Sequence, residues 1–150
     1  MTTAFDFWLD TWAVHSREGV FLGRNHVEAL LGGTVIQEHW EGATGGRGTS
    51  LNACTPDPAV WRQTWVDDGG HFLDLEGGLE GNRMILRGQS STREGLIAER
   101  LSWTPLEDGR VLQLWEQSPY GESTWRVAFE DFYSRIKFTP LDPVGLPSRL

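Results

Sequence analysis

The 150-residue sequence contains a single cysteine, Cys54. One cysteine excludes a disulfide within the chain and is too few for a cysteine-based zinc site. Low cysteine use is typical of reducing compartments, so we expect a cytoplasmic protein. The sequence also lacks a run of about 18 apolar residues, and residues 1–12 lack the basic and apolar regions of a signal peptide. We therefore expect neither a membrane span nor export.

Basic residues are scarce relative to acidic ones. Thirteen Lys and Arg face 21 Asp and Glu, which gives a net charge of −8. A field of this sign repels phosphate backbones and anionic lipid headgroups. Nucleic acids and membrane surfaces are therefore not the expected partners.

Uninterrupted helical patterns are lacking as well, because 18 glycines and seven prolines divide the chain into short segments. Turn pairs such as Asp108-Gly109 separate the segments and connect antiparallel neighbours. The pattern predicts a single all-β domain over residues 1–136, an up-and-down antiparallel β-barrel of about eight to ten strands. We expect a short aromatic helical turn at residues 5–9, and then strands over residues 11–15, 20–23, 25–30, 34–41, 49–55, 61–66, 72–76, 83–88, 97–105, 111–117 and 123–136.

Residues 137–150 form a C-terminal tail with three prolines, which exclude a regular strand or helix. Five apolar side chains also lie there: Phe138, Leu141, Val144, Leu146 and Leu150. Three readings stay open for this tail: disorder, packing across the barrel, and packing onto a second copy in a homodimer.

The expected strands alternate in an unusual way, because polar side chains share a face with large aromatic ones. Trp61, Gln63 and Trp65 lie on one face of their strand, and Ile36, Glu38 and Trp40 on one face of theirs. A solid core excludes unpaired polar groups, since each costs about 1 to 3 kcal/mol when buried. The alternation therefore favours a barrel with a wet or ligand-filled interior.

Many segments resemble those of a family of small bacterial calycin-type proteins, whose fold class includes lipocalins and fatty-acid-binding proteins. They are FDFWLDTWAV, GRNHVEALLGGTVIQEHWEG, GTSLN, WRQTWVDDGG, LDLEGG, RMILRG, LSWTP, DGRVLQLWEQS and STW. The match spans residues 5–136 and implies a barrel with an internal cavity. It carries over neither a function nor a cofactor, because this barrel hosts unrelated activities.

Tryptophans and amides are the candidate ligand-binding residues. We expect five indole rings to form the wall of a pocket for a planar or polycyclic molecule: Trp40, Trp61, Trp65, Trp103 and Trp115. Trp8 and Trp12 are expected to be structural. Asn52, Gln63 and Gln113 would orient the ligand, together with Glu38, if these residues face the lumen.

Glu38 is the first candidate for an acid or base, because a carboxyl group among tryptophans has a raised pKa. The alternatives are that Glu38 pairs with Arg62 or Arg100, or that it faces water. His39 is the second candidate, should the opposite face of its strand point inward. The histidines offer no pair at metal-ligand spacing, so we expect no metal site and no cofactor. Cys54 is expected to be a small buried hydrophobe.

Three functions remain open from the sequence. The first is binding of an apolar or polycyclic small molecule. The second is a cofactor-independent isomerase, cyclase or lyase of bacterial secondary metabolism that acts on such a molecule. The third is an interaction module whose barrel is filled by its own side chains.

Overall fold

The computed structural model describes residues 4–119 and 123–137, and these residues form one all-β barrel. Two short 3-10 turns, η1 (Asp6–Trp8) and η2 (Leu31–Gly33), accompany the strands. The ten strands are β1 (Asp10–Ser16), β2 (Phe21–Leu30), β3 (Val35–Gly42), β4 (Arg47–Cys54), β5 (Trp61–Asp67), β6 (Phe72–Glu80), β7 (Arg83–Thr92), β8 (Gly95–Pro105), β9 (Val111–Pro119) and β10 (Arg126–Arg135).

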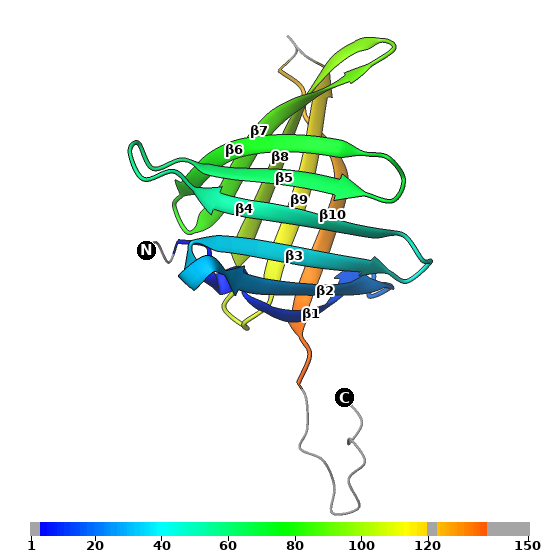
Figure 1. Cartoon of the computed structure of the whole chain (residues 1–150). Helices are drawn as coiled ribbons and strands as arrows, with labels where there is room; N and C mark the ends of the chain where they lie inside the picture. The colour runs from blue at the N-terminus through cyan, green and yellow to red at the C-terminus, as the bar shows by residue number, and fades with distance from the viewer. Residues whose placement is uncertain (1–3, 120–122, 138–150) are drawn as a thin grey trace, which may run out of the picture.

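Each strand pairs antiparallel with the next along the chain, and β10 pairs with β1 to close the barrel. In Figure 1, β2 to β6 cross the view while β7 to β10 run steeply behind them. Closure gives every strand a paired neighbour on both sides. The structure therefore confirms the predicted up-and-down β-barrel and the short aromatic turn before it.

Tight turns connect the neighbouring strands. In the β8–β9 connection, Gly109 has a φ of 89°, a left-handed conformation that glycine adopts without strain. The backbone N–H of Leu106 donates to the carbonyl of Arg110 across this turn. The Asp108-Gly109 pair thus acts as the hairpin turn expected from the sequence.

Three strands are longer than the sequence predicts, because glycines inside them do not end them: β2, β6, and β7, which was expected to end at residue 88 and continues through Gly88 to Thr92. Residues 20–23 and 25–30 were expected as separate strands, but β2 runs through both. Gly23 faces the ring of Trp40 on β3, and that ring occupies the space a side chain would need. Likewise β6 continues past residue 76 through Gly77, where the Ile85 carbonyl of β7 approaches too closely for a Cβ. These glycines permit close packing within strands.

One end of the barrel is closed by the N-terminal segment. Phe5 and Trp8 are fully buried there, at the end where β5 begins and β8 ends. No helix among residues 4–119 and 123–137 is long and apolar enough to cross a membrane. The proposed tail over residues 137–150 lies outside the described residues, apart from its first residue.

Candidate functional site

Four aromatic rings pack together to form the plug, which we define as Phe5, Trp8, Trp61 and Trp103. Phe5 stacks on Trp8 with ring centroids 4.8 Å apart, and meets the rings of Trp61 and Trp103 edge-on at 5.5 and 5.2 Å. All four residues are buried. Two of the rings expected to contact a ligand, Trp61 and Trp103, therefore belong to the plug that seals this end of the barrel.

Trp12 supports the plug from β1. Its indole N–H donates to the backbone carbonyl of Trp8 over 2.8 Å, and its ring meets that of Tyr133 edge-on. Both residues are buried. This arrangement gives Trp8 and Trp12 structural contacts, as expected from the sequence.

A chain of hydrogen-bonded polar side chains crosses the barrel beyond the plug, and we call it the polar chain. Its order is Gln63, Asn52, Ser50, Glu38, Asn25, Tyr133 and Gln113. The four polar residues expected to face inward, Glu38, Asn52, Gln63 and Gln113, are all members. All seven are buried. Burial is tolerated because each side chain has at least one hydrogen-bond partner.

Glu38 lies at the middle of the polar chain. Ser50 Oγ donates to its Oε1 over 2.6 Å, and Asn25 Nδ2 donates to its Oε2 over 2.7 Å. Burial raises the pKa of Glu38 above its ordinary value, and these two donors partly oppose the rise. The expected alternatives for Glu38 do not occur, since Arg62 pairs with Glu76 and Arg100 with Glu116.

Tyr133 connects Asn25 to Gln113. Its hydroxyl donates to Gln113 Oε1 over 2.5 Å and accepts from Asn25 Nδ2 over 3.1 Å. Burial, followed by the charge of Glu38, raises the pKa of Tyr133 well above its ordinary value. The phenol is therefore a neutral donor over the physiological range.

Three half-buried tryptophans surround the other end, which we call the open end. Trp40 and Trp65 extend sideways along the wall, because their six-membered rings occupy the space beside Gly23 and Gly48 on the preceding strands. The Trp65 indole N–H donates to Asp67 Oδ2 over 3.1 Å.

Trp115 completes this wall from β9, and Glu99 holds its orientation. The Trp115 indole N–H donates to Glu99 Oε2 over 2.5 Å, while Ser90 and Gln117 donate to Oε1. The ring of Phe129 meets that of Trp115 edge-on at 4.9 Å. Glu99 is buried, and both its carboxylate oxygens are occupied within the protein.

Asp131 is a second inward carboxyl group near the open end. It lies two residues from Tyr133 on the same face of β10, opposite Gln113 of β9. Burial raises its pKa to about 6. In the described part of the chain, no hydrogen bond or ion pair reaches its carboxylate. Asp131 is therefore an unpaired acid that faces the interior.

Gln113, the cross-strand partner of Asp131, is not fully enclosed. Gln113 retains 7 % exposure although it faces inward, and its amide nitrogen donates to no atom of the described chain. That nitrogen is not among the enclosed, unpartnered atoms. Solvent therefore reaches part of the Gln113 side chain.

His39 points away from this site. Strand alternation turns Glu38 inward and His39 outward, where its Nε2 lies 2.9 Å from Glu28 Oε2 and its ring stacks near His26. The condition for His39 as an acid or base, that its face be the inner one, is therefore not met. No group of residues among the described ones has the arrangement of a metal site.

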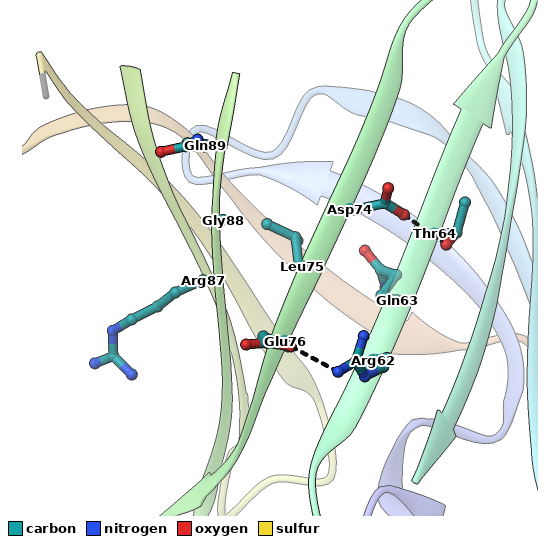
Figure 2. Close-up of a pocket in the computed structure, with 9 residues that line it drawn as sticks. All are labelled: Arg62, Gln63, Thr64, Asp74, Leu75, Glu76, Arg87, Gly88 and Gln89. Atoms are coloured by element: carbon teal, nitrogen blue, oxygen red, sulfur yellow. Dashed lines mark hydrogen bonds and ion pairs between the residues drawn. The ribbon is translucent and has the colours of Figure 1, made fainter. Parts of the chain in front are cut away.

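A separate hollow of about 410 Å³ lies over β5, β6 and β7. Figure 2 shows its lining, where the Arg62–Glu76 ion pair and the Thr64–Asp74 hydrogen bond bridge β5 and β6. The pairing of β6 with β7 ends at Leu75 and Gly88, so the strands separate there. Two inward-facing residues also line this side hollow: Gln63, a member of the polar chain, and the buried Leu75.

Sequence reasoning missed several residues of the site. They are Asn25, Ser50, Glu99, Asp131 and Tyr133. The alternation of Phe129, Asp131 and Tyr133 along one strand repeats the mixture of aromatic and polar side chains seen in the other inward rows. That signal is present in the sequence and could have identified Asp131.

The closed ten-stranded barrel is consistent with a calycin-like fold. No model of a known protein family matches the chain, and no curated protein matches it significantly.

Proposed function

We propose that the protein binds a planar, largely apolar small molecule at the open end, between the indole rings of Trp40, Trp65 and Trp115. The observation that carries the proposal is the placement of Trp40 and Trp65 over Gly23 and Gly48. Large aromatic rings held along an inner wall, and left half-buried, offer flat apolar surface to a guest.

The energetics favour such a guest. Covering about 100 Å² of exposed indole surface contributes roughly 2 to 3 kcal/mol at about 25 cal/mol per Å². The plug closes the far end, and the polar chain forms the floor, so the ligand has one apolar wall and a few polar groups to orient it. This combination is typical of small-molecule sites.

Calorimetric titration with acridine, a neutral planar tricycle near neutral pH, tests the proposal. We expect Trp65→Leu to weaken binding about tenfold, because it removes one stacking surface. Trp125→Leu is the matched control, since Trp125 is also half-buried but packs on Arg100, on the outer face. Equal losses in both variants, or no binding to the wild type, would contradict the proposal.

A second candidate function is acid–base catalysis on the bound molecule, without a cofactor. It is favoured by two inward carboxyl groups with raised pKa values, Glu38 and Asp131. Asp131 is the better candidate acid or base, because both oxygens of Glu38 already accept hydrogen bonds.

Small molecules retained by protein from its producing cells distinguish the two functions. If the protein is a catalyst, Asp131→Asn retains a molecule that differs in chromatographic retention or fragmentation from the one in the wild type. If it is only a binder, both retain the same compound.

A further inference from the structure

We propose that the ligand of the open end carries a positive charge, as an organic ammonium or amidinium group on its planar body. This inference rests on the proposed function, since it concerns the ligand of the same site. It is carried by an unpaired carboxylate and by the aromatic wall beside it.

Asp131 supplies the charge. Its carboxyl group is inward-facing and half-buried on β10, between Phe129 and Tyr133 on the same face. No described residue donates to it, although burying an ionised group without a partner is costly. A cationic group of the ligand would remove that cost.

The other inward carboxylates are already satisfied. Glu38 accepts from Ser50 and Asn25, and Glu99 accepts from Ser90, Trp115 and Gln117. Asp131 is thus the inward carboxylate of the described chain that remains free for a ligand.

No arginine of the described chain compensates Asp131 from inside the barrel. Six of them form ion pairs with acids: Arg17, Arg62, Arg87, Arg100, Arg110 and Arg135. The other described basic residues are exposed: Arg24, Arg47, Arg83, Arg93, Arg126 and Lys137. The interior that the structure describes is therefore acidic, and it disfavours an anionic ligand.

The aromatic wall suits a cation as well as an apolar body. Trp115 lies on the same face of β9 as Gln113, the cross-strand partner of Asp131, and Phe129 packs against its ring. The negative face of an indole attracts a cation within about 6 Å of its centroid. The same rings therefore contact both parts of such a ligand.

Three tricyclic probes of the same shape test this inference by calorimetry near neutral pH and at ~0.15 M ionic strength. They are 9-aminoacridine, which is a cation, acridine, which is neutral, and acridine-9-carboxylate, which is an anion. We expect the cation to bind about tenfold more tightly than the neutral probe, and the anion to bind most weakly.

Variants separate the site from the overall charge of −8. Asp131→Asn should weaken 9-aminoacridine about tenfold and leave acridine unchanged, and Asp131→Glu should keep the preference for the cation. Asp74→Asn makes the same change in net charge on the outer face, where Asp74 bonds Thr64, and should alter neither probe. Circular dichroism confirms that each variant is folded.

The outcomes distinguish this inference from the proposed function. Equal affinity for the cationic and neutral probes overturns the charge preference and leaves the open-end site intact. An equal effect of Asp74→Asn and Asp131→Asn assigns the preference to the overall field and also overturns it. If none of the probes binds, both proposals fail.

Discussion

Trp115 donates its indole N–H to Glu99 over 2.5 Å, so an inward tryptophan at the open end is oriented by a buried carboxylate on the adjacent strand. Ser90 and Gln117 hold the other oxygen of Glu99. These hydrogen bonds keep the Trp115 ring in one orientation when no ligand is bound. The pocket wall is therefore preorganised by side-chain hydrogen bonds.

Glu99→Ala should destabilise the fold by about 1 to 3 kcal/mol, because it leaves three donors without their acceptor. It should also weaken acridine binding, since Trp115 loses its fixed orientation. Urea unfolding and calorimetry measure the two effects. Glu94→Ala, in the exposed β7–β8 turn, is the control and should change neither. A stable Glu99→Ala with unchanged affinity would show that Glu99 does not position the ring.

Tyr133→Phe should cost about 1 to 3 kcal/mol of unfolding free energy, because Gln113 Oε1 loses its donor and Asn25 loses one acceptor. The change removes one oxygen and little volume, so the loss reports on the polar chain and not on packing. Urea unfolding is the measurement, with Ser134→Ala on the opposite face of β10 as the control. Equal stability of wild type and Tyr133→Phe would mean that water replaces the phenol.

Phe5→Ala should lower the unfolding free energy by about 3 to 5 kcal/mol, since Phe5 is fully buried against three rings of the plug. Phe7→Ala, next to it but only partly buried, should cost less. Thermal unfolding followed by tryptophan fluorescence compares the two variants. Similar midpoints for both would contradict the role of the plug in closing the barrel.

Stability should fall as pH rises from about 4 to 6, because the pKa of Asp131 is about 6 in the folded state and close to 3.9 in an unfolded chain. Between these two pKa values the folded state binds more protons than the unfolded state. The contribution of Asp131 to the free energy of unfolding is therefore complete at acidic pH and is lost as the pH rises toward neutral. Solvent partly screens Asp131, which reduces the effect to the order of 1 kcal/mol. Glu38 acts in the same direction, since its pKa is also raised.

Unfolding in urea at a series of pH values measures this dependence. Asp131→Asn should flatten the slope between about pH 4 and 6 and should be the more stable form near neutral pH. Asp74→Asn should leave the slope unchanged. A slope that persists in Asp131→Asn would assign the titration to another group.

The sequence predicted the closed barrel because the spacing of glycine and proline requires short connections between antiparallel strands. The alternation of side chains along each strand also predicted correctly that Glu38, Asn52, Gln63 and Gln113 face inward. It did not separate tryptophans of the plug from those of the wall. That division depends on the N-terminal segment, which places Phe5 and Trp8 between Trp61 and Trp103. Contacts between residues so distant along the chain have no local pattern.

Asp131 was missed for a different reason. The expected strand over residues 123–136 contains an irregular register between Val127 and Phe129. The inward–outward alternation counted from the start of the strand therefore gives the wrong face for residues after this point. Counting backward from a buried tyrosine, Tyr133, would have placed Asp131 inward. The absence of a partner for its carboxylate required three-dimensional coordinates.

Indole N–H resonances test the central claim most directly, because each tryptophan gives one ¹H–¹⁵N signal. We predict that titration with 9-aminoacridine shifts the signals of Trp40, Trp65 and Trp115, at the open end, and leaves those of Trp8, Trp61 and Trp103, in the plug, and of Trp125, outside, nearly unchanged. Shifts confined to the plug or to Trp125, or no shift at saturating probe, would contradict a ligand site at the open end of the barrel.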